Sequence, residues 1–180
     1  MFLVLGITGI WTSHVSVGKS LEKAQTITVA ETPLQQVEAR ASLDSFEPEK
    51  GQVIGLVSLP ALSKKLPIIQ GTEDDQLKKG VGHYVKSSFP GEDNQVVLSG
   101  HRDTVFTHLG DLEKGDTVIV KLPYGSFTYS VDHTKIVKAD NQKVIHSTDK
   151  EELVLTTCYP FHYVGHAPKR YIVYAYPVEG

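Results

Sequence analysis

The sequence has little cysteine, no excess of basic residues and no long apolar run, and each shortage excludes a class of protein. Cys158 is the one cysteine in 180 residues, which excludes an internal disulfide framework and any metal centre built from clustered cysteines. The 18 Lys and Arg against 21 Asp and Glu give a formal net charge of -3, so nucleic-acid binding is not indicated. The 40% hydrophobic and 22% charged residues are typical of a globular domain.

Residues 1–50 are expected to form a membrane anchor remnant and a linker. The apolar run 1–11 (MFLVLGITGIW) is shorter than the about 20 residues that a spanning helix needs, and it lacks the basic start of a signal peptide. It is interpreted either as the outer end of an anchor or as a tail packed on the domain. The capping pattern Thr32, Pro33 and Gln35 predicts a short amphipathic helix in the linker.

Residues 51–180 are expected to form the second, β-rich domain. Short runs rich in Val, Ile, Thr and Tyr alternate with turn residues at 52–59, 66–70, 81–85, 95–100, 116–122, 127–138, 152–158 and 170–177. So many short strands predict a barrel or a sandwich. Two short helices are expected between them, over 72–79 and near 104–109.

Cys158 stands at the end of the predicted strand 152–158. Alternation along a strand places Val154, Thr156 and Cys158 on one face. A lone cysteine is commonly a small buried hydrophobe, but functional groups are often displayed where a strand meets a loop. The position therefore favours a nucleophilic thiol, which needs a proton-accepting or cationic neighbour.

Two residues qualify as partners for this thiol. His101 follows the buried strand 95–100, and Gly100 before it permits a sharp exit or a close approach by a substrate. Arg170 opens the last strand, and antiparallel pairing with strand 152–158 would place it beside Cys158, where a guanidinium can stabilise an oxyanion. The ordinary alternatives are a hydrogen-bonded loop histidine and a solvated arginine at a strand edge.

Other polar residues are weaker candidates. The acidic run 73–75 suits the start of a helix, with a cation site as the minor alternative. Asp103 either caps the short helix near 104–109 or orients His101, and the sequence does not separate the two. His162 and His166 have the spacing of metal ligands on a helix, but Gly165 and Pro168 argue against a helix there.

Three segments together resemble the catalytic segments of the sortase family, in the order His, Cys, Arg. They are Leu98-Ser-Gly-His101-Arg-Asp-Thr104, Leu155-Thr-Thr-Cys158-Tyr-Pro-Phe161 and Pro168-Lys-Arg170. The likeness extends over roughly residues 51–178 and is greatest to class D sortases, with class E as the near alternative. Val154 departs from the family's Thr-Leu-x-Thr-Cys motif.

The resemblance implies an all-β fold, a closed eight-stranded barrel that is mainly antiparallel but mixed, with one or two short helices. It also implies a cysteine transpeptidase that cleaves an LPxTA or LPxTG sorting signal after Thr. Cys158 would form a thioester, His101 would act as general acid and then base, and Arg170 would hold the oxyanion. Thr157 and Gly100 are expected to contact substrate. No metal or other cofactor is expected to be required, and modulation by a divalent cation is left open.

The implied partners are surface proteins that carry the sorting signal and an acceptor amine of peptidoglycan or its lipid-linked precursor. The implied location is the outer face of the cell membrane, where the N-terminal anchor would hold the protein. No nucleic-acid partner is expected. Part of the loop between Lys138 and Glu152 would wall the pocket for Leu-Pro. Two alternatives remain: a cysteine hydrolase on the same His-Cys-Arg site, and a non-catalytic cell-surface barrel that binds a partner.

Overall fold

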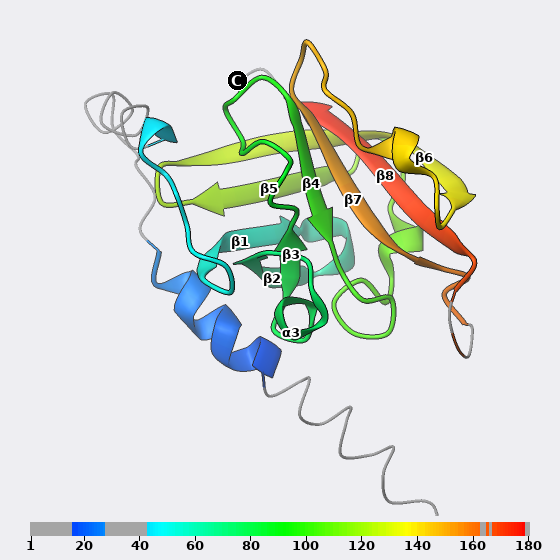
Figure 1. The fold of residues 1–180 in the computed structure, drawn as a ribbon, viewed down its shortest axis with the longest axis horizontal. Coiled ribbons are helices and arrows are strands. Elements are labelled where there is room, and N and C mark those ends of the chain that lie inside the picture. Colours follow the sequence, from blue (N-terminus) through cyan, green and yellow to red (C-terminus); the bar gives the residue numbers. More distant parts are fainter. Residues whose placement is uncertain (1–15, 28–42, 163–164, 166, 179–180) are drawn as a thin grey trace, which may run out of the picture.

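Eight strands form a closed barrel in the computed structural model, which describes residues 16–27, 43–162, 165 and 167–178. Their order around the barrel is β1, β2, β3, β4, β7, β8, β6, β5 (Figure 1). The strands are β1 Val53–Leu59, β2 Lys64–Gln70, β3 Val81–His83, β4 Gln95–Ser99, β5 Thr117–Leu122, β6 Gly125–Lys138, β7 Glu152–Tyr159 and β8 Lys169–Pro177. The predicted mixed barrel and its eight strands are therefore confirmed.

The helical segments of the barrel domain are short. Helix α3 covers Asp74–Leu77 and begins at a capping box between Glu73 and Gln76, so the predicted helix over 72–79 exists but is shorter. The helix predicted near 104–109 is wrong, because residues 102–108 form turns and a 3-10 turn, η2, follows at Leu109–Asp111. Two further 3-10 turns are η1 Pro60–Leu62 and η3 Gln142–Val144.

Two parallel pairings determine where the strand ends meet. Strands β2 and β3 are parallel and are joined by the crossover that contains α3, while β4 and β7 are parallel and are joined through β5 and β6. Parallel neighbours end at the same edge of a sheet. The carboxyl ends of β4 and β7 therefore lie side by side, and the antiparallel β8 begins next to them.

Side chains along β7 alternate between two hydrophobic clusters. Leu153 and Leu155 belong to the main core inside the barrel. Val154 belongs to a second, smaller cluster with Val97, Val144, Ile172 and Tyr174. This alternation confirms the predicted division of β7 into two faces, and it places Thr156 and Cys158 on the outer face with Val154.

Residues before β1 also pack on the barrel. Residues 16–25 are helical and lie beside β1 and β2 (Figure 1). The side chains of Val17, Leu43 and Phe46 pack against the main core. Burial of these apolar side chains stabilises the domain, so part of the predicted linker belongs to it, while a boundary at residue 51 stays a prediction.

The predicted anchor over 1–11 and the predicted helix after Thr32 lie outside the described residues. Among the residues that are described, no helix combines the length and the hydropathy that crossing a membrane requires.

Candidate active site

Cys158 and Arg170 are directly opposite each other across the antiparallel pair β7–β8. Directly opposed residues project to the same face of a sheet, with their Cβ atoms about 4.5–5.5 Å apart. Both side chains are only partly buried. The predicted neighbourhood of this thiol and this guanidinium is therefore confirmed, and both groups are open to a ligand.

His101 lies at the same end of the barrel. Ser99 pairs with Thr156 in the parallel ladder, and the Gly100 N–H donates to the Thr156 carbonyl at 3.0 Å. His101 comes directly after Gly100, and Cys158 comes two residues after Thr156. Both side chains are therefore at the same end of the paired strands. The imidazole is about one-third exposed, so the fold brings a thiol, an imidazole and a guanidinium to one accessible edge.

Thr157 and Gly100, the expected substrate contacts, lie beneath this edge. Thr157 is 3% exposed, and its hydroxyl donates to the Gly100 carbonyl at 2.7 Å. A Cβ at position 100 would lie 2.5 Å from Cδ2 of Phe106, which is why glycine is required where the chain leaves β4. Both residues therefore support the backbone before His101 from the barrel interior.

Asp74 is the carboxylate that the structure places beside His101, with Oδ1 3.8 Å from Nε2 of the ring. Its other oxygen pairs with Lys78 at 2.5 Å. The hydrogen bond from Lys78 and the charges of Lys78 and His101 lower the pKa of Asp74, so this carboxylate is ionised near neutral pH. Sequence reasoning assigned Asp74 to the helix start, with a cation site as the minor alternative, because the β2–β3 crossover that brings it beside His101 leaves no signal in residue spacing.

The segment between β7 and β8 is tied to both sides of the site. Arg170 donates through Nη1 to the carbonyls of Ala167 and Lys169 at 3.3 and 3.1 Å. Arg102, next to His101, donates to the Gly165 carbonyl at 3.1 Å. These bonds fix the loop after Cys158 to the loop that carries the imidazole, which limits the movement of the guanidinium relative to the thiol.

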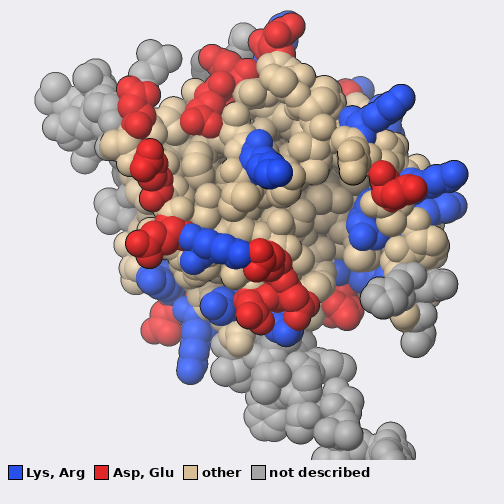
Figure 2. All heavy atoms as spheres, viewed as in Figure 1, with Lys and Arg blue, Asp and Glu red and all other residues tan. Residues whose placement is uncertain are grey.

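The chemistry that this edge offers is nucleophilic attack by a thiol with proton transfer by an imidazole. No cluster of three or more potential metal ligands occurs within the described part of the chain. His166, one of the two histidines that were weak candidates, lies outside it. Figure 2 shows a mainly uncharged centre on the face viewed in Figure 1, with acidic and basic side chains around its rim. Such a face suits a largely uncharged peptide.

A family model described as the sortase domain matches residues 57–178. The chain belongs to the sortase family. It is 56% identical to sortase D of Bacillus subtilis (strain 168) over 131 residues, which cover 72% of this chain and 66% of that relative. The sortase thus spans slightly less than two thirds of that curated relative, and the predicted likeness to class D is confirmed.

Solved structures of sortases share the fold. The catalytic domain of Bacillus anthracis SrtD is 41% identical, with a TM-score of 0.64 over 74% of this chain and 92% of that one. Clostridium perfringens sortase C, solved with the C-terminal cell wall sorting motif, is 26% identical, with a TM-score of 0.71 over 92% and 99% of the two chains.

Proposed function

We propose that this sortase is a cysteine transpeptidase that cleaves an LPxTA or LPxTG sorting signal after its threonine and transfers the protein to an amine. The observation that carries the proposal is the pairing of Cys158 with Arg170 at the strand edge where His101 also lies. Membership of the sortase family supports the same reaction.

The first half of the reaction forms a thioester. The Cys158 thiol gives its proton to His101, and the thiolate attacks the threonine carbonyl carbon. The carbonyl electron pair moves onto oxygen, and the Arg170 guanidinium stabilises that oxyanion. When the oxyanion collapses, the C–N bond breaks and His101 donates a proton to the departing amine. The upstream part of the substrate is then held on sulfur.

The second half releases the product. An acceptor amine attacks the thioester carbon while His101 takes up its proton, and the C–S bond breaks to return the Cys158 thiolate. Asp74 beside His101 attracts the proton-bearing ring and helps to orient it. Bonds and protons balance over the two halves without any cofactor.

The acceptor is an amine of peptidoglycan or its lipid-linked precursor, and the sortase works at the outer face of the membrane on an N-terminal anchor. A related fold has been solved with a cell wall sorting motif, which supports a peptide signal as the donor. The apolar residues 1–11 support the anchor.

The decisive experiment is the mass of the products from LPxTA and LPxTG peptides, with and without an added diaminopimelate-like amine. We expect the wild type to release the fragment after Thr and to join the remaining acyl part to the amine. A hydrolase would yield the free acid whatever the amine concentration, and a binding module would yield neither product.

Cys158→Ala is the matched control. It should lose both cleavage and ligation while its urea unfolding midpoint stays that of the wild type, because the thiol is partly exposed and lies outside the core. Retained cleavage by Cys158→Ala would refute the proposal.

A further inference from the structure

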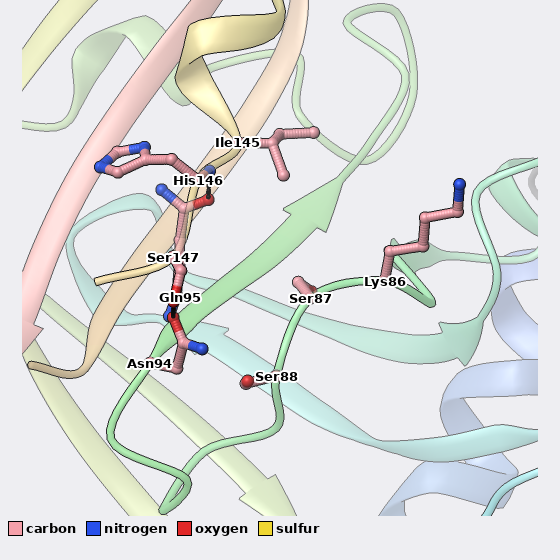
Figure 3. A pocket seen from close by; sticks show the side chains of 8 residues that line it. All are labelled: Lys86, Ser87, Ser88, Asn94, Gln95, Ile145, His146 and Ser147. Atoms are coloured by element: carbon pink, nitrogen blue, oxygen red, sulfur yellow. Dashed lines mark hydrogen bonds between the residues drawn. The ribbon is translucent and has the colours of Figure 1, made fainter. Parts of the chain in front are cut away.

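A polar pocket of about 220 Å³ opens at the amino ends of β4 and β7, away from the thiol. It lies between the loop before β4 and the segment that leads into β7 (Figure 3). Small-molecule sites usually measure roughly 300–1,000 Å³, so this pocket suits one or two amino-acid side chains. Among the described residues, those that line it include Lys86, Ser88, Asn94, Ile145 and Ser147, and none carries a carboxylate.

Two donors of the pocket, the Asn94 amide nitrogen and the Lys86 ammonium group, indicate the kind of ligand. The Asn94 side-chain oxygen already accepts from the backbone N–H groups of Gln95 and Thr148, at 2.8 and 2.9 Å. Its amide nitrogen is thereby turned toward the pocket, on the side of Ser88 (Figure 3). Lys86 adds a positive charge, and no ion pair joins it to an acid within the described ranges. A charged donor and an amide donor that no acid engages favour a carboxylate ligand.

The pocket and the thiol lie on the same pair of strands. Gln95, which lines the pocket, pairs with Glu152 at the start of β7, and Cys158 lies six residues further along that strand. At about 3.3 Å per residue the separation is about 20 Å, which an extended peptide also covers with about six residues.

The side chains that lie over the strands between the two points are apolar. Val97 and Val154 on the outer faces of β4 and β7 are buried, and Val144 and the partly exposed Tyr84 cover them. Ile145, at 43% exposure, adds an apolar side chain to the pocket rim. The leaving amine and the incoming amine need the open side beyond the strand ends. The part of the substrate before the scissile bond, which stays bound as the thioester, is therefore expected to lie over these strands.

We propose that the pocket binds an acidic side chain two or three positions before the leucine of the sorting signal. The inference rests on the proposed function, since four of the six residues that span the distance are the Leu-Pro-x-Thr motif. Tyr84 and Ile145 then face Leu-Pro, the Asn94 amide donates to the carboxylate, and Lys86 at the pocket rim attracts it by its charge. Recognition extends upstream of the motif and selects among substrates that share it.

The test compares three peptides that differ only at the second and third positions before leucine, which carry Glu, Gln or Lys. We expect the wild type to turn over the Glu peptide with a kcat/KM about 5- to 10-fold above that of the Gln peptide, through KM rather than kcat. Lys86→Glu should reverse the order of the Glu and Lys peptides. Lys143→Glu, an equal charge change in η3 outside the pocket lining, is the matched control.

An unchanged Glu-to-Gln ratio in Lys86→Glu would overturn the subsite, as would an equal loss for all three peptides or the same reversal in Lys143→Glu. If the Gln peptide is cleaved but no preference for Glu is seen, the subsite fails while the proposed function stands. If no peptide is cleaved, the proposed function fails, and the affinities of the three peptides then test the subsite. Fluorescence anisotropy of the labelled peptides on Cys158→Ala, with and without Lys86→Glu, should then show the same order.

Discussion

The two ends of the parallel pair β4–β7 differ in how their polar groups are used. At the carboxyl end, His101, Cys158 and Arg170 are partly exposed. At the amino end, Glu151 and Glu152 are buried, with exposures of 9% and 7%, and hydrogen bonds engage both oxygens of each carboxylate.

We call the amino end the closed end, because its acids are buried, and the carboxyl end the open end, because its reactive side chains are partly exposed. The Gln95 amide donates to Glu152 and to the Val144 carbonyl, and its oxygen accepts the His146 N–H. These bonds fix the loop before β7 to the start of β4, and they thereby help to set the register between β4 and β7. Hydrogen bonds at the amino end of the pair thus stabilise the fold, while the carboxyl end presents the reactive side chains.

Arg170→Ala should produce the largest effect at the open end. Loss of the guanidinium removes the oxyanion's donor, and we expect kcat to fall about 10²- to 10³-fold, as for removal of an oxyanion-hole donor. Arg170→Lys keeps the charge but not the planar fork and should recover only part of the rate. Both variants should unfold at the wild-type urea concentration, and a kcat within twofold of wild type would contradict the role.

Glu151→Ala should produce the largest effect at the closed end. It removes the acceptor for the Tyr129 hydroxyl and for the Gly91 N–H, and Tyr129 is fully buried. We expect unfolding in urea to show a loss of at least about 2 kcal/mol, because buried donors are left without partners. The exposed control Glu113→Ala should change stability by less than about 0.5 kcal/mol, and Glu151→Ala should keep kcat while folded.

His83, which pairs with Leu98 of β4, should make the stability of the fold sensitive to acid. Its ring is 1% exposed, and burial lowers its pKa. The unfolded chain therefore binds a proton near pH 6.5 that the folded protein does not yet bind, so stability is complete above about pH 6.5 and is lost as the pH falls toward the folded pKa, by up to about 1.4 kcal/mol per pH unit.

Urea midpoints measured between about pH 5 and pH 7.5 test this linkage. His83→Gln should be less stable at neutral pH, because Nε2 of His83 bonds the Ser88 carbonyl at 3.0 Å, but should show a flatter pH dependence. His108→Gln, on an exposed ring, should keep the wild-type slope, and an equal slope in His83→Gln would exclude His83 as the source.

Asp74→Asn should produce the smallest effect, because exposed ion pairs contribute little. We expect kcat to fall less than about fivefold and the difference from wild type to vanish near 1 M salt, where screening is strong. Asp75→Asn also neutralises an acid near Lys78, at 3.7 Å, and should leave kcat unchanged. Equal losses in the two variants would show that Asp74 does not act through His101.

The barrel and most of the site could be predicted from local patterns. Alternation and turn residues mark the eight strands, and the short connection from β7 to β8 makes antiparallel pairing, and so the Cys158–Arg170 register, the natural expectation. Alternation also put Thr157 on the face opposite Cys158, which agrees with its burial. The expected contact of Thr157 with substrate stays a prediction.

Features made by distant segments could not be predicted. Asp74 reaches His101 only because β2 and β3 pair in parallel. The polar pocket joins residues 86–95 to residues 145–147, and each segment alone is an ordinary polar loop. The helix expected near 104–109 failed because packing of Val105 and Phe106 into the core, at exposures of 2% and 1%, outweighs local helix signals.

Intact-protein mass spectrometry of the sortase mixed with an LPxTA or LPxTG peptide, quenched in acid without an acceptor amine, tests the nucleophile most directly. We predict an adduct with the mass of the acyl part of the peptide, located on Cys158 by digestion, discharged by hydroxylamine and absent from Cys158→Ala. Cleavage of the peptide without any adduct, or an adduct of the same mass on Cys158→Ala, would contradict attack by this thiol.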